Sequence, residues 1–145
     1  MNNKDVLDNL LFQRNAIQLR YVELIDVQFN NVGIEAYSDL PFALYKHAEI
    51  ENDYANIFLT AEIGSKEDTG FSMTIKYKGQ VYSTTNIDTE QLKNYALQNV
   101  VPMLLPYIRE VSSSLISRTT LPSFMLPTLD VINYLKAIND NDQTN

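Results

Sequence analysis

The stretch VPMLLPYIREVSSSLISRTTLP, residues 101–122, decides the fold of this chain of 145 residues. Its apolar side chains recur at helical spacing, at Leu104, Ile108, Val111 and Leu115. Two prolines, Pro102 and Pro106, stand in the first half of this predicted helix. Each lacks a backbone N–H and clashes with the carbonyl four residues earlier, which for Pro106 belongs to Pro102. Because both defects fall in one turn, we expect a single kink that lets the helix follow a twisted sheet.

The helix is expected to begin near Thr89, upstream of the quoted stretch. Asp88 and Gln91 have the spacing of a capping box, in which two side chains satisfy free N–H groups of the first turn. Ile87 and Leu92 stand at the positions of a hydrophobic staple. These signals add about three turns to the helix.

The helix should end near Arg118, because a cation suits the negative carboxyl end of a helix. Thr128 is a candidate N-cap for a second, shorter helix, which we predict from Leu129 to Asn139. A chain of this length suits one hydrophobic core, so residues 1–140 are interpreted as a single domain. The polar residues 141–145 are expected to form a disordered tail.

Alternation of apolar and polar residues predicts four strands before the helix. One face of the first strand is expected to comprise Leu19, Tyr21, Ile25, Val27 and Phe29. The other strands are centred on residues 42–50, 57–63 and 71–77, and Gly79 is interpreted as a bulge or bend after the last. Connections this short indicate antiparallel pairing. The prediction is an α+β fold, a four-stranded antiparallel sheet covered on one face by a long proline-kinked helix and a shorter C-terminal helix.

The composition argues against catalysis. The chain has no cysteine and a single histidine, His47, which lies in mid-strand and is interpreted as a surface residue. The four glycines form no phosphate-binding loop and no nucleophile elbow. We therefore expect no enzyme activity, no metal site and no cofactor.

Charge and hydropathy restrict the partners and the location. A net charge of −7 argues against nucleic-acid binding, which needs a basic surface. No apolar run approaches the roughly 20 residues of a membrane helix, so no membrane insertion is expected. The N-terminus has no signal peptide, and the predicted location is cytoplasmic.

Within the helix, the run PYIREVSSSLISRTTLP, residues 106–122, resembles the signature of the SecB family of protein-export chaperones. That family carries Pro-Tyr-x-Arg-Glu, then Ser-Arg-x-Thr, an apolar residue and Pro. The matching residues are Pro106, Tyr107, Arg109, Glu110, Ser117, Arg118, Thr120 and Pro122. The order of four strands, a long helix, a proline-containing loop and a closing helix is similar as well, over residues 17–135. Arg109 and Arg118 are interpreted as structural, since a guanidinium can satisfy several buried acceptors.

The resemblance implies an ATP-independent holdase, which binds unfolded or precursor polypeptides in apolar grooves and uses no cofactor. It also implies a dimer or tetramer, in which subunits pair through strands and the pairs pack through the long helices. Both a role in protein export and a role in a toxin–antitoxin system stay open. An alternative from another class is a small-ligand-binding or scaffold α+β protein without chaperone activity.

The loop LPSFMLP, residues 121–127, is unusually apolar for a connection. The candidate client-binding residues are Phe124, Met125, Leu126 and, as weaker candidates, Tyr45 and Tyr134. Methionine and aromatic side chains suit a surface that adapts to many partners. The three loop side chains also suit plugs of the core, and both interpretations stay open.

The resemblance gives less support to docking on the SecA motor, which the family performs through an acidic surface of its sheet. Asp26 matches one acidic position of the first strand. Asn30, Lys76 and Lys78 stand where acidic side chains are expected. These three departures argue against a SecA-type partner.

Overall fold

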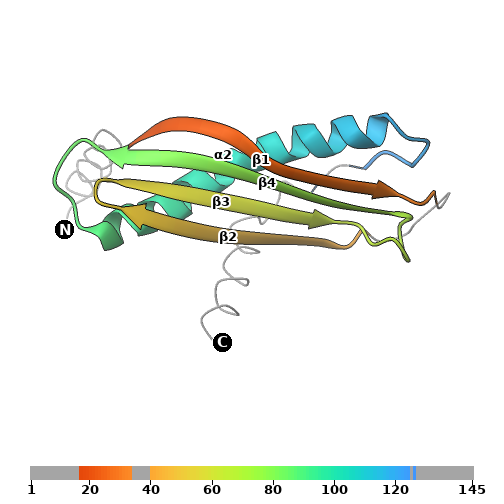
Figure 1. Cartoon of the computed structure of the whole chain (residues 1–145), viewed down its shortest axis with the longest axis horizontal. Coiled ribbons are helices and arrows are strands. Elements are labelled where there is room, and N and C mark those ends of the chain that lie inside the picture. The colour runs from red at the N-terminus through yellow and green to blue at the C-terminus, as the bar shows by residue number, and fades with distance from the viewer. Residues whose placement is uncertain (1–16, 34–39, 125, 127–145) are drawn as a thin grey trace, which may run out of the picture.

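The computed structural model describes residues 17–33, 40–124 and 126. It contains strands β1 (Ile17–Asn31), β2 (Phe42–Glu51), β3 (Tyr54–Ile63) and β4 (Phe71–Ser83), and helix α2 (Thr89–Ser117). The strands form one antiparallel sheet in the order β1-β4-β3-β2. Figure 1 shows α2 crossing one face of this sheet on a diagonal, from the β2 edge to the β1 edge. The expected α+β fold, with four antiparallel strands and a covering helix, is confirmed.

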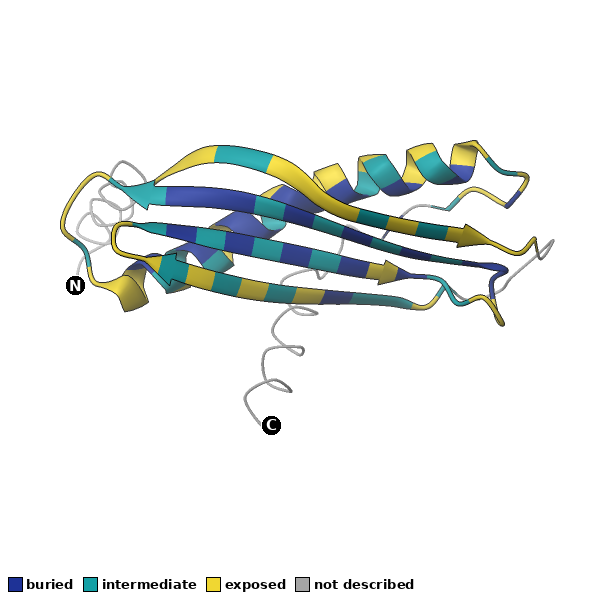
Figure 2. Ribbon diagram, viewed as in Figure 1, coloured by how far each residue is buried: buried dark blue, intermediate teal, exposed yellow. Residues whose placement is uncertain are grey.

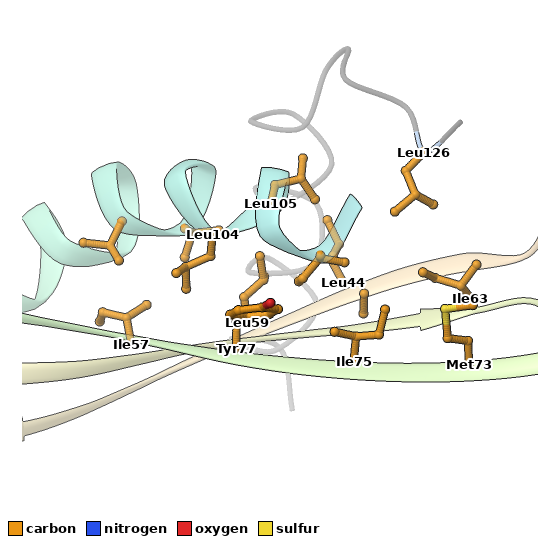
Figure 3. Close-up of a cluster of buried hydrophobic side chains, with 14 of the residues drawn as sticks. Leu44, Ile57, Leu59, Ile63, Met73, Ile75, Tyr77, Leu104, Leu105 and Leu126 are labelled. Carbon is orange, nitrogen blue, oxygen red and sulfur yellow. The ribbon is translucent and has the colours of Figure 1, made fainter. Parts of the chain in front are cut away.

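The face of the sheet toward α2 is apolar because side chains alternate along the two central strands. Every second residue of β3 from Ala55 to Ile63 is buried, as is every second residue of β4 from Phe71 to Tyr77. The predicted inward faces of both strands are confirmed, and Figure 2 shows the alternation. The helix buries Leu92, Ala96, Val100, Val101, Leu104, Leu105, Ile108, Ser112 and Ile116. In Figure 3, Leu104 and Leu105 lie directly over the side chains of the sheet.

Strand β1 departs from its predicted face because it carries two β-bulges. Its register with β4 shifts between Leu19 and Tyr21 and again between Leu24 and Asp26. Each shift inserts an extra residue and reverses the face on which the following side chains lie. The prediction that Tyr21 and Ile25 share the buried face was therefore wrong. Tyr21 pairs with Gln80, and its hydroxyl accepts a hydrogen bond from the Gln80 side chain on the face away from α2. Ile25 is exposed. Val22 packs on the core in place of Tyr21.

Helix α2 begins at Thr89, where the sequence predicts it. A carboxylate oxygen of Asp88 accepts a hydrogen bond from the Glu90 N–H at 3.3 Å, which makes Asp88 the N-cap. The helix is continuous over 29 residues, with Pro102 and Pro106 inside it. The kink at these prolines stays a prediction. The predicted second helix at residues 129–139 lies outside the described residues.

Gly79 allows α2 to approach the sheet closely. It pairs in regular register with Val22 and Ile57, so the bulge expected at this glycine is not there. A Cβ atom at Gly79 would lie 2.8 Å from Cγ1 of Val100 and 3.3 Å from Cδ2 of Leu104. Side chains of the helix thus fill the space that a methyl group would need, and only glycine fits without a shift.

Replacing Gly79 with Ala should lower the free energy of unfolding by about 1–3 kcal/mol, the range for an overpacked core. The double variant Gly79→Ala, Val100→Ala should recover part of this loss, because the shorter side chain makes room for the added methyl group. Denaturant unfolding of the wild type, both single variants and the double variant measures this coupling. Strictly additive losses would contradict the close approach of helix and strand.

Candidate functional site

Those candidate client-binding residues that the structure describes lie on both faces of the sheet. Tyr45 of β2 is 47% exposed, and its register partner Thr60 points away from α2. Phe124 lies on the opposite side, where it packs against the core. Within the described residues, these two side chains do not share one surface. Met125 and Tyr134 lie outside the described residues.

The segment that follows α2 contributes side chains to one end of the core. The ring of Phe124 stacks on that of Phe71, with centroids 5.7 Å apart and planes at 4°. Leu126 is buried, and Figure 3 shows its side chain over those of Ile63 and Met73. Phe124 is half-buried, so it combines a structural contact with a partly exposed aromatic surface.

An exposed apolar surface that the sequence did not reveal lies where α2 passes β1. It consists of Leu24 and Ile25 on β1 and of Met103 and Tyr107 on α2, which are between 42% and 48% exposed. We call these four residues the β1–α2 surface. Tyr77 of β4 joins its two halves, because it pairs with Leu24 and its ring lies 5.5 Å from that of Tyr107. Tyr77 thus connects Leu24 of the strand half to Tyr107 of the helix half.

One signal in the sequence points to the helical half of this surface. Met103 and Tyr107 are four residues apart, so they share a helix face beside the predicted apolar stripe. Burial raises the pKa of the Tyr77 phenol beneath them, and the Glu110 carboxylate and Tyr107 raise it further. Tyr77 therefore stays neutral at physiological pH and acts as an apolar link between the two elements.

The face of the sheet away from α2 carries three cations over aromatic rings. The distances from cation to ring centroid are 4.8 Å for Lys76 over Phe58, 5.4 Å for Lys78 over Tyr21 and 4.8 Å for Arg20 over Tyr82. A hydrogen bond with Tyr21 raises the pKa of Lys78, and the charges of Tyr21, Glu23 and Glu49 add to the shift. Lys78 is therefore charged at physiological pH.

Asp26, the candidate motor-docking residue, is exposed on this same face. The register sets it beside Lys76, and its Oδ2 accepts a hydrogen bond from Nε2 of Gln28 at 3.0 Å. Because Lys76 and Lys78 occupy the central strand next to it, the face has mixed charge rather than an acidic character.

His47 has the surroundings of a surface residue. It is exposed on β2, its Nε2 lies 3.6 Å from Oε1 of Glu49, and its ring lies 6.1 Å from that of Phe58. Across residues 17–33, 40–124 and 126, no three His, Cys, Asp or Glu side chains gather in a way that could hold a metal ion. In the same part of the chain, no helix combines the length and the hydropathy of a membrane span.

Two comparisons relate this fold to known proteins. The family model described as preprotein translocase subunit SecB matches residues 39–141. Among solved structures, a similar one is Mycobacterium tuberculosis Rv1957, a SecB-like chaperone in complex with a ChAD peptide from the Rv1956 HigA1 antitoxin. The match has 17% sequence identity and a TM-score of 0.67, and it covers 79% of this chain and 91% of the other. This second likeness is one of fold.

Replacing Phe124 with Ala should lower the free energy of unfolding by about 1–3 kcal/mol, because the ring loses apolar burial and its stacking on Phe71. Tyr45→Ala is the matched control, since an exposed aromatic side chain should change stability by no more than about 0.5 kcal/mol. Urea denaturation followed by circular dichroism compares the two. Equal losses of stability would show that the core and surface assignments are mistaken.

Proposed function

The chain belongs to the SecB family, and we propose that it acts as an ATP-independent holdase, which binds unfolded polypeptide and keeps it from aggregating. The observation that carries the proposal is the family match over residues 39–141. The peptide bound to a chaperone of similar fold supports it. Burial of apolar surface drives such binding and needs neither a nucleotide nor a metal ion.

A holdase has to recognise what unfolded chains share, which is apolar side chains and unpaired backbone. Apolar burial contributes about 25 cal/mol per Å², so useful affinity builds up over several client residues. We propose that Tyr45 and Phe124 take part, because each leaves aromatic surface exposed. Met125 and Tyr134 belong to the same proposal. Leu126 is buried, so its contact with a client requires a movement of its segment.

We also propose that copies of the chain associate through the β1–α2 surface into a dimer or tetramer. Its four apolar side chains are nearly half exposed in the single chain. Contact with the same surface of a second copy would bury them, and such self-complementary contacts close as two-fold dimers. A tetramer would need a second contact in addition.

The partners that we propose are unfolded or precursor polypeptides in the cytoplasm. The peptide in the related structure comes from an antitoxin, so an antitoxin segment is a client of the same chemical kind. Lys76 and Lys78 lie beside Asp26 on the outer face of the sheet. This mixed charge speaks against a SecA-type motor as a partner, and with it against a SecA-dependent role in export.

The protein should suppress the light scattering of a reduced, slowly folding client protein in the absence of ATP. Tyr45→Ser should weaken this suppression several-fold, because the variant lacks an exposed aromatic contact. Tyr82→Ser is the control from the same face of the sheet, and Phe124→Ser is compared only after its melting curve is known. Full activity of Tyr45→Ser would remove Tyr45 from the client site. If the wild-type protein does not suppress the light scattering of the client, a small-ligand-binding or scaffold role is favoured.

Light scattering of the purified protein should give a multiple of the chain mass of 16.6 kDa. Tyr107→Glu should shift the mass toward that of the single chain, because an unpaired carboxylate in an apolar interface is strongly unfavourable. Tyr45→Glu places the same charge outside the β1–α2 surface and should leave the mass unchanged. A mass of 16.6 kDa for the wild type at all micromolar concentrations is the result that rules out self-association.

A further inference from the structure

The side chain of Met103 brings a sulfur atom to the surface of the protein. The sequence has four methionines and no cysteine, so methionine supplies every sulfur atom of the chain. Met73 and Met103 lie within the described residues, and Met1 and Met125 lie outside them. Met73 is 1% exposed in the core, whereas Met103 is 48% exposed on α2. An oxidant in solvent therefore reaches Met103 far more readily than Met73.

Met103 belongs to the β1–α2 surface, through which we propose that copies of the chain associate. It lies about one turn of α2 before Tyr107, whose ring contacts that of Tyr77. On the strand side of the surface, Leu24 and Ile25 add two aliphatic side chains. Contact between two copies would remove all of this apolar area from water, which favours association. The contribution of Met103 therefore depends on the apolar character of its thioether.

The thioether of methionine reacts with hydrogen peroxide without a metal ion or a cofactor. A lone pair of the sulfur atom attacks one oxygen of the O–O bond, which breaks. The proton of the attacked oxygen moves to the departing oxygen, which leaves as water. Sulfur is oxidised by two electrons to the sulfoxide, and the peroxide is reduced. Methionine sulfoxide reductases reverse this modification, which turns an apolar side chain into a polar one.

We propose that Met103 is a redox-sensitive modification site, at which hydrogen peroxide forms methionine sulfoxide and thereby weakens the contact between copies of the chain. This inference rests on the proposed self-association and names a way in which it is regulated. Burying a polar S=O group among apolar side chains is unfavourable. A two-fold contact contains Met103 from both copies, so each dimer carries this cost twice.

The contact that the sulfoxide weakens is also the contact that shields the sulfur. Association with a second copy would cover Met103, so peroxide reacts mainly with the dissociated chain. Because dissociation decreases as the protein concentration rises, the oxidation rate of Met103 should fall as well. An exposed methionine outside any contact between copies has no such dependence on concentration.

The first experiment follows the oxidation of each methionine in the full-length protein by peptide mapping and mass spectrometry. In hydrogen peroxide, Met103 should oxidise at least about tenfold faster than Met73, because the core protects Met73. Raising the protein concentration through the range in which the chain associates should slow the oxidation of Met103 several-fold. Free methionine, added as an internal standard, should oxidise at the same rate throughout.

The second experiment measures the association by light scattering before and after peroxide treatment. Oxidation should raise the dissociation constant at least about tenfold, and a methionine sulfoxide reductase with dithiothreitol should restore it. Met103→Leu keeps a similar volume and apolar character, so this variant should associate like the wild type and keep its mass in peroxide. Met73→Leu is the matched control and should dissociate in peroxide as the wild type does.

The outcomes separate this inference from the self-association on which it rests. If the oxidised protein keeps its mass, or if Met103→Leu dissociates in peroxide like the wild type, Met103 is not the redox-sensitive site. An oxidation rate of Met103 that is independent of protein concentration would place this side chain outside the contact and overturn the inference as well. A wild-type protein that is a single chain before any peroxide is added overturns the self-association itself.

Discussion

The packing of one helix against four strands is the constraint on which the other features depend. Neighbouring strands lie about 4.8 Å apart, so the outer strands are about 14 Å apart, whereas a helix with its side chains is about 10 Å wide. Helix α2 crosses the sheet diagonally and packs on the two central strands, β3 and β4, with a close approach at Gly79, beside which lie Val100 and Leu104. The inner face of both outer strands is therefore only partly covered. The exposed apolar side chains on β1 and the half-buried ones on β2 follow from this.

The parts of the fold that the sequence predicts are those in which each residue obeys one regular period. Strands β3 and β4 alternate without interruption from Ala55 to Ile63 and from Phe71 to Tyr77, and the helix start is marked by Asp88. β1 could not be predicted in the same way. Bulges depend on how a strand pairs with its neighbour, and a shift of one residue moves every later side chain to the other face.

The candidate site also has features that the sequence predicts and features that only the structure reveals. The apolar character of Phe124 is evident from its sequence, but its stacking on Phe71 depends on a residue fifty-three positions away, and no local pattern records that contact. The exposure of Tyr45 agrees with the alternation of buried and exposed side chains along β2, so the sequence could predict it. Met103 and Tyr107 share a helix face, yet only the structure reveals that Tyr107 is connected to Leu24 through Tyr77.

An edge strand exposes unpaired backbone groups that can pair with other chains and cause aggregation, and the two edges of this sheet differ in how they limit it. β1 is distorted by bulges, whereas β2 stays regular and carries Lys46, His47 and Glu49 along its length. The charges of Lys46 and Glu49 disfavour pairing with a strand that gains little from apolar contacts. For the proposed holdase, a client that folds would gain about 5–15 kcal/mol of its own stability and bury its apolar side chains, so its release would need no nucleotide.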